Sequence, residues 1–143
     1  MMNNLTLIAN TLTNAFAFYP INVALRQSNY IAAGLTSSSM LASILMHATE
    51  TKHQLIPPVA GEYSEHFLNI DRLMSVLLIS YGVYHVSKIS PYLLLAPGLK
   101  LITGTICLRL GEMTSNLPLY TLLHTIWHYC AYTSLGDVMM INY

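Results

Sequence analysis

The sequence predicts an all-α protein, namely an integral membrane helical bundle with about five transmembrane helices in a single domain, residues 1–143. Of its 143 residues, 54% are hydrophobic and only 8% are charged, whereas a soluble domain carries about 25% charged residues. Five apolar stretches, each long enough to cross a bilayer, follow one another along the chain. Six acidic residues balance six basic ones, so no excess of positive charge indicates nucleic acid. We therefore expect membrane lipid, and not nucleic acid, as the partner.

The first two expected spans cover residues 5–25 and 30–47. The N-terminus lacks the basic region of a signal peptide, so we expect it to be retained. The second span is rich in alanine and serine, and such small residues allow helix backbones to approach closely in a membrane. Ser43 differs from the other serines because it precedes His47 by one helical turn and lies on the same face. The first span contains three asparagines that we expect to face other helices: Asn10, Asn14 and Asn22.

A long polar loop, residues 48–66, separates the second span from the third, residues 67–86. The loop contains a Pro-Pro pair that cannot continue a helix, and its charged residues are typical of a solvated face. The third span carries Asp71 and Arg72 in its first turns. Neighbouring residues point in different directions on a helix, so we expect Arg72 to reach the interface and Asp71 to point into the bundle.

The fourth and fifth expected spans cover residues 91–110 and 117–135. In the fourth, a Pro-Gly pair predicts a kink shortly before Lys100. We expect Lys100 to point into the bundle or toward a phosphate or a carboxylate, because an unpaired lysine is costly in hydrocarbon. The fifth span carries His124 and His128 one helical turn apart, and therefore on one face.

The direction of each helix places several polar side chains in one half of the bundle. The second span ends at the membrane face that carries the long loop, and the third begins there. The fourth returns the chain to that face, so the fifth begins there as well. With a rise of about 1.5 Å per residue, the polar residues of these spans fall in the half near the loop: Ser43, His47, Asp71, His124 and His128.

These five residues form a candidate metal site. Three histidines and a water molecule are a ligand set that zinc uses in catalytic sites, and histidines four residues apart can converge on one ion. Asp71 is a candidate to hold that water or accept its proton, and Ser43 to orient a carbonyl or stabilise an oxyanion. Other interpretations stay open: the histidines can be structural, Ser43 a packing residue, and Asp71 the partner of Arg72 or Lys100.

The order of these motifs resembles that of the CREST superfamily of membrane hydrolase-like proteins. This superfamily includes the alkaline ceramidases, the progestin and adipoQ receptors and the Per1-like proteins. The resemblance covers residues 13–87 and 117–135 and is strongest to the myomaker and transmembrane-protein-8 branch. The segments that carry it are Thr13–Pro20, Ala24–Tyr30, Ser43–Glu50 and His124–His128, the last with its tryptophan.

The resemblance implies a zinc ion held by His47, His124 and His128, with Ser43 and Asp71 as further site residues, and hydrolysis of amide bonds in lipids. Members of that family usually have seven spans, so five spans imply a shortened version of the seven-helix fold. Loss of two spans between the third and the last leaves the helix directions unchanged, and with them the site. It also removes part of the wall that would hold a lipid chain.

The leading hypothesis is therefore an intramembrane zinc-dependent hydrolase that acts on a lipid amide or ester, with Asp71 and Ser43 as catalytic residues. One alternative is a non-catalytic multi-pass membrane protein in which a structural zinc ion, completed by Glu50 or His53, only ties helices together. Another is a small subunit of a membrane complex that binds no metal.

Overall fold

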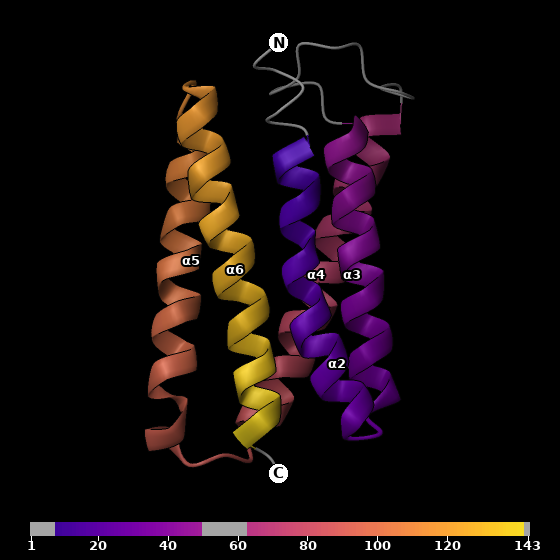
Figure 1. Ribbon diagram of the computed structural model, residues 1–143, viewed down its shortest axis with the longest axis vertical. Coiled ribbons are helices and arrows are strands. Elements are labelled where there is room, and N and C mark those ends of the chain that lie inside the picture. Colours follow the sequence, from indigo (N-terminus) through magenta and orange to yellow (C-terminus); the bar gives the residue numbers. More distant parts are fainter. Residues whose placement is uncertain (1–7, 50–62, 142–143) are drawn as a thin grey trace.

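The computed structural model describes residues 8–49 and 63–141, and all regular secondary structure in these two ranges is helical (Figure 1). This confirms the all-α fold class. Residues 8–12 are α-helical and continue directly into the first labelled element. The elements are the 3-10 helix η1 (Thr13–Ala17), α2 (Phe18–Arg26), α3 (Tyr30–Thr49), α4 (Ser64–Val86), the 3-10 helix η3 (Pro91–Leu94), α5 (Leu95–Met113) and α6 (Leu117–Ile141).

Each of the five expected spans corresponds to one helical rod, although some boundaries differ. Helix α6 continues to Ile141, beyond its expected end at Leu135, so the segment after Leu135 is helix and not a tail. Pro97 lies in the first turn of α5, and not at a kink in the middle of a span. Proline is tolerated there because its missing N–H has no helical partner to lose. Most of the expected polar loop, residues 50–62, lies outside the described residues.

Two asparagines fix the starts of the helices that carry the candidate site. The side-chain oxygen of Asn29 accepts a hydrogen bond from the Ala32 N–H at 3.1 Å, and that of Asn116 accepts one from the Leu119 N–H at 3.0 Å. Such caps satisfy N–H groups that have no partner within the first turn of a helix. A fixed first turn also fixes the helical phase, and so the face on which later side chains emerge.

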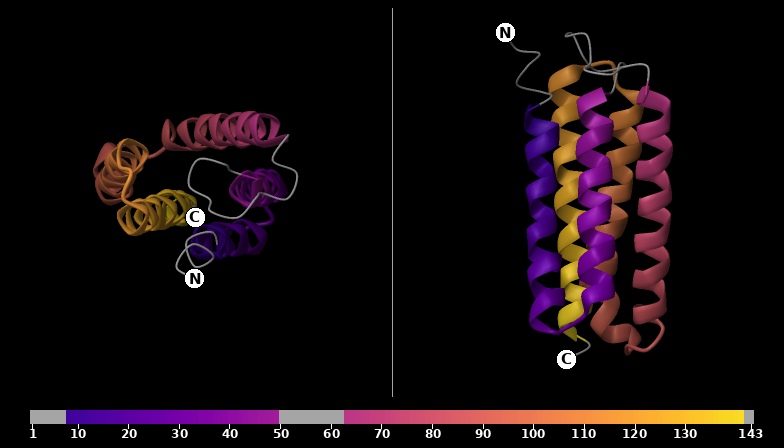
Figure 2. Two further views of the ribbon diagram at one scale, coloured as in Figure 1. Left: turned by 90° about the horizontal axis from the view of Figure 1, so that it is seen from above. Right: turned by 90° about the vertical axis from the view of Figure 1, so that its right-hand side faces the viewer.

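Helix α6 lies at the centre of the packing (Figures 1 and 2). It packs side by side with α5 and also against α2 and η1, whereas α3 packs against α2, η1 and α4. Helix α4 lies beside α3, makes only slight contact with α6, and has no buried residue. The bundle is thus a pair of helices, α5 and α6, joined through α6 to the group formed by α2, α3 and α4.

Glycine allows α6 to approach its neighbours closely at two positions. A Cβ atom on Gly104 of α5 would lie 2.7 Å from the Cβ atom of Cys130, and one on Gly136 of α6 would collide with the ring of Tyr19. Small residues at helix crossings are typical of membrane bundles. Helix α3 follows the same rule, since the residues that it buries are mostly small: Ala32, Ala33, Thr36, Ser39, Ala42 and Ser43.

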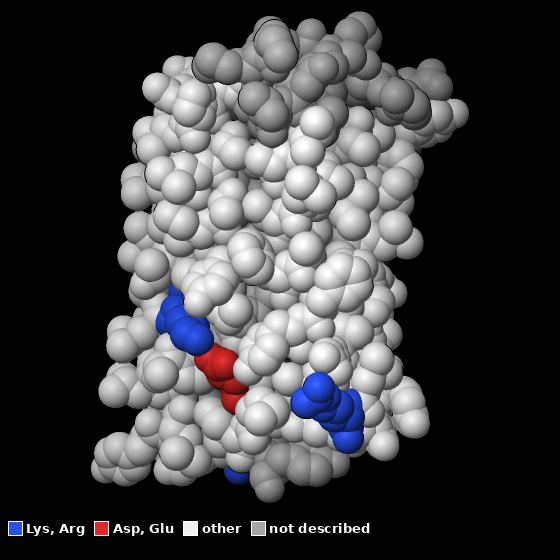
Figure 3. Space-filling model, viewed as in Figure 1, with Lys and Arg blue, Asp and Glu red and all other residues white. Residues whose placement is uncertain are grey.

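Small and polar residues occupy the interior of the described part of the bundle, and large apolar ones its exterior. Its buried hydrophobic residues include five alanines but no leucine, isoleucine or phenylalanine, whereas many leucines and isoleucines are exposed. Asn10 and Asn14 are buried as expected, but Asn22 is exposed, so the expectation that it faces another helix is wrong. Figure 3 shows one face of the molecule, on which the charged side chains of the described residues lie in the lower part.

Two helical segments are long and apolar enough to cross a membrane: α3 and the segment Pro91–Met113, which joins η3 to α5. Helices α4 and α6 are at least as long as α3, but their sequences are more polar. The side chains that reduce their hydropathy include Asp71 and Arg72 on α4 and His124 and His128 on α6. Membrane-spanning character is therefore indicated for two helices by length and composition.

Candidate metal centre

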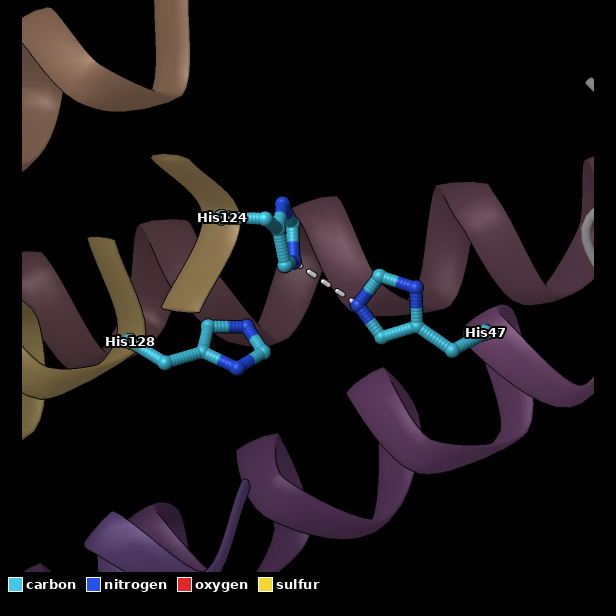
Figure 4. Close-up of side chains that lie close together, drawn as sticks. All are labelled: His47, His124 and His128. Carbon is cyan, nitrogen blue, oxygen red and sulfur yellow. Dashed lines mark hydrogen bonds between the residues drawn. The ribbon is translucent and has the colours of Figure 1, made fainter. Parts of the chain in front are cut away.

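Three buried histidines from two helices lie close together (Figure 4), near the end of α3. His47 lies in the last turn of α3, and His124 and His128 lie on consecutive turns of α6. Their exposed fractions are 1%, 6% and 5%. Figure 4 shows His47 approaching from α3 and the other two rings from α6, with all three converging on one region. The structure thus brings together the three histidines that the sequence predicts as metal ligands.

The spacing of the histidine nitrogens suits a transition-metal ion. One nitrogen from each ring contributes to a group whose members all lie within 4.8 Å of one another. The Nε2 atoms of His47 and His124 are 2.8 Å apart. A tetrahedral zinc ion holds two nitrogen ligands roughly 3.3 Å apart, because its bonds to nitrogen measure about 2.0–2.1 Å. The nitrogens are therefore close enough together for the group to hold zinc or another ion that imidazole binds.

Aromatic side chains extend the histidine stripe along α6. The ring centroid of Tyr120 lies 5.3 Å from that of His124, and the ring centroid of Tyr132 lies 5.9 Å from that of His128. These four residues follow one another at intervals of four, so they share one face of the helix. All four are buried. The helical repeat therefore positions two of the three ligands, and α3 supplies the third.

Asp71 and Ser43 lie around the histidines and not among the ligand atoms. Asp71 stands two turns into α4, half-buried, within electrostatic range of the His47 imidazole and the Arg72 guanidinium. Ser43 is buried on α3, one turn before His47. The ligand group found among the described residues consists of the three histidines alone. The structure thus gives a carboxylate within electrostatic range of His47 and a buried hydroxyl one helical turn from it.

The first helical rod also contacts the histidines, which the sequence pattern did not predict. Thr13 of η1 has its Oγ1 atom 2.8 Å from Nδ1 of His128. Beside it, the Tyr132 hydroxyl donates to Asn14 Oδ1 at 3.2 Å, and Asn14 Nδ2 donates to the Asn10 carbonyl at 3.3 Å. The sequence carries a partial signal, because polar residues three and four apart in an apolar rod indicate a polar face. It does not indicate which helix that face meets.

A second group of polar side chains joins α2, α5 and α6 away from the histidines. Lys100 Nζ donates to Asp137 Oδ2 at 2.5 Å, and the Tyr19 hydroxyl donates to Asp137 Oδ1 at 3.1 Å. Asp137 lies about 14 Å further along α6 than His128. The expectation that Lys100 faces a carboxylate is confirmed. The partner is not Asp71, which the sequence left open, but Asp137, which lies beyond the expected end of the fifth span at Leu135.

His85 does not join the histidine group in the described part of the chain. It packs against Tyr81 and Tyr84 near the far end of α4. Glu50 and His53, the candidate fourth ligands, lie outside the described residues. The three histidines therefore carry the case for a metal centre.

Comparison of the chain with protein-family models, with curated proteins and with solved structures finds no match in any of the three. The candidate site is therefore defined by its own geometry. It comprises three buried histidines on two helices, a carboxylate in electrostatic range and a buried hydroxyl one turn away. Such a group can bind a metal ion or join helices through hydrogen bonds.

Proposed function

We propose that this chain is an integral membrane protein that acts as a zinc-dependent hydrolase on a lipid amide or ester inside the bilayer. One observation carries the proposal: three buried histidines from α3 and α6 converge within a bundle whose exterior is apolar. The same residues, with Ser43 and Asp71, form the pattern by which the sequence resembles the CREST superfamily. That resemblance supports the choice of reaction.

The distribution of side chains supports a bilayer as the surroundings of the bundle. Large apolar residues cover the outside of α4 and α5, among them Leu73, Val76, Ile102 and Ile106. In water, an exposed apolar surface of this extent would promote association, whereas in a membrane it meets lipid chains. Polar and small residues in the interior then provide the helix contacts that membrane bundles use.

The histidines fit zinc in ligand type and number. Three histidines leave a fourth position for water or substrate, which is the arrangement of catalytic zinc sites. Zinc bound there supplies a nucleophile at neutral pH, since it lowers the pKa of its water to about 7, and polarises a carbonyl group. The buried imidazoles of His47, His124 and His128 hold the ion, and burial on two helices keeps them in one geometry.

The chemistry of Asp71 and Ser43 suits the remaining roles. The Asp71 carboxylate, within electrostatic range of His47, accepts the proton of the attacking water. The Ser43 hydroxyl, one turn from His47, orients the carbonyl of the substrate and donates to the developing oxyanion. A lipid arrives laterally past α4, the helix that has no buried residue and only slight contact with α6.

A second candidate function is a purely structural one, and the distance between two histidines supports it. The hydrogen bond of 2.8 Å between the Nε2 atoms of His47 and His124 joins α3 directly to α6. In a metal-free protein, this hydrogen bond between histidines would hold the two helices together. The chain would then be a structural membrane protein or a subunit of a larger complex.

Metal content decides between these functions. Wild-type protein, His124→Ala and the control His85→Ala would be purified in detergent and analysed by elemental mass spectrometry. We expect about one zinc per chain in the wild type and in His85→Ala, and almost none in His124→Ala. Hydrolysis of a ceramide and of a fatty-acyl ester would then be assayed in mixed micelles.

The outcomes of this experiment differ for each function. Zinc in the wild type together with zinc-dependent release of fatty acid supports the hydrolase. Zinc without hydrolysis of either lipid contradicts the hydrolase and favours a structural ion. Well-folded wild-type protein that takes up no zinc contradicts both metal functions. The structural role, in which a hydrogen bond between histidines joins α3 to α6, then remains.

A further inference from the structure

Thr13 makes two short contacts through one hydroxyl group. Its Oγ1 atom lies 2.8 Å from the Asn10 carbonyl oxygen in its own rod and 2.8 Å from Nδ1 of His128 on α6. A threonine hydroxyl carries one proton, and its oxygen can accept hydrogen bonds as well as donate one. The two contacts together therefore determine where the protons lie.

Only one arrangement places a proton in both contacts. A carbonyl oxygen cannot donate, so the Thr13 hydroxyl must donate to Asn10. The contact with His128 then needs a donor on the histidine, and Nδ1–H supplies it. If the hydroxyl donated to His128 instead, two oxygens would face each other at 2.8 Å with no proton between them. His128 thus donates to Thr13, and Thr13 donates to the Asn10 carbonyl.

We propose that Thr13 is a positioning residue that holds His128 with its proton on Nδ1, so that the Nε2 lone pair faces the candidate metal. This inference rests on the proposed metal site. A neutral imidazole carries one proton, so protonation of Nδ1 leaves Nε2 as the acceptor. Figure 4 shows one ring nitrogen of His128 facing the other two histidines and the other facing away from them. The nitrogen that bonds Thr13 is Nδ1.

This contact gives η1 a part in the site although it supplies no ligand. Histidines that bind metals commonly donate their second N–H to another group, which fixes the tautomer and the ring orientation. His128 follows that rule through Thr13. Loss of such an outer partner typically lowers metal affinity by about 10–100-fold.

The tautomer of His128 tests the inference without any metal. Two-dimensional ¹H–¹⁵N spectra of metal-free protein in detergent distinguish a ring protonated on Nδ1 from one protonated on Nε2. We expect the Nδ1–H form in the wild type and in Thr13→Ser, and a mixture of forms in Thr13→Val, which keeps the side-chain shape but lacks the hydroxyl. An Nε2–H form in the wild type, or the same tautomer in Thr13→Val as in the wild type, would overturn the inference.

Zinc titration, followed by competition with a chelator dye, tests the consequence for the metal. We expect Thr13→Val to bind zinc about 10–100-fold more weakly than the wild type and Thr13→Ser to match the wild type. Thr133→Val is the control, because the Thr133 hydroxyl donates to the Tyr129 carbonyl of its own helix at 2.7 Å. Equal affinity in Thr13→Val and Thr133→Val would overturn the inference while leaving the metal site intact. A wild type that binds no zinc overturns the proposed function, and the tautomer of metal-free His128 still decides the role of Thr13.

Discussion

Lys100 on α5 and Asp137 on α6 form an ion pair of 2.5 Å in the half of the bundle that lacks the histidines. The Tyr19 hydroxyl, from α2, donates to the same carboxylate. Three helices therefore meet at one charged group. In a bilayer, each of these charges alone would be costly, and the pair removes most of that cost.

Removal of one partner of this pair should destabilise the protein more than removal of both. Asp137→Asn leaves Lys100 without a counter-charge, and we expect a loss of about 2–3 kcal/mol in the free energy of unfolding. The double variant Lys100→Met/Asp137→Asn should recover at least half of that loss. Denaturant titration in detergent micelles measures both values.

The control for this prediction is Glu112→Gln. Glu112 pairs with Arg109 at 3.2 Å on the exposed surface of α5, and exposed pairs contribute about 0–1 kcal/mol. A double variant that is less stable than Asp137→Asn would contradict the expected role of the pair, as would equal effects of Asp137→Asn and Glu112→Gln.

The sequence was sufficient to predict the helices and the meeting of the histidines. Apolar stretches of spanning length determine where helices form, and their alternating directions bring His47 to the same half of the bundle as His124 and His128. Neither argument needs contacts between side chains. The interval of four residues between His124 and His128 then fixes their common face.

Contacts between residues distant in sequence could not be predicted in the same way. The bond between Thr13 and His128 depends on the rotation of the first rod about its axis, which hydropathy does not determine. The partner of Lys100 depends on where α6 ends. Polar residues near the end of a helix make that end difficult to predict from hydropathy. The exposure of Asn22 could not be predicted either, because a single polar residue does not reveal which face of its helix is buried.

Gly104 should be intolerant of even one methyl group. A Cβ atom there would lie 2.7 Å from Cys130 Cβ and 3.2 Å from Trp127 Cε3, so α5 and α6 would have to separate. We expect Gly104→Ala to lower the free energy of unfolding by about 1–3 kcal/mol. Gly98→Ala, on the same helix with nothing within 4 Å of the added atom, should be neutral or slightly stabilising. Thermal unfolding in detergent compares them, and equal midpoints would show that the α5–α6 contact is looser than the structure indicates.

Zinc should stabilise the wild-type protein against unfolding, because it joins α3 to α6 only in the folded chain. At a free zinc concentration one hundred times the dissociation constant, the gain is about 2.7 kcal/mol. His47→Ala should lose this gain, whereas His85→Ala should keep it. The readout is the thermal midpoint with zinc, with excess chelator and with magnesium, which prefers oxygen ligands. A zinc-induced shift of the same size in His47→Ala would place the binding site elsewhere.

Asp71 and Ser43 should affect hydrolysis without removing the metal, because the group of ligand atoms found among the described residues is formed by the three histidines. Asp71→Asn keeps the size of the side chain but cannot accept a proton, and we expect hydrolysis to fall by about 10²–10⁴-fold. Ser43→Ala removes one donor to the oxyanion and should cost about 10²–10³-fold. Zinc content should stay near that of the wild type in both variants. Ser39→Ala, buried one turn earlier on the same helix, is the control and should keep most of the activity. Loss of zinc in Asp71→Asn would make Asp71 a ligand rather than a base, and full activity in Ser43→Ala would reduce Ser43 to a packing residue between helices.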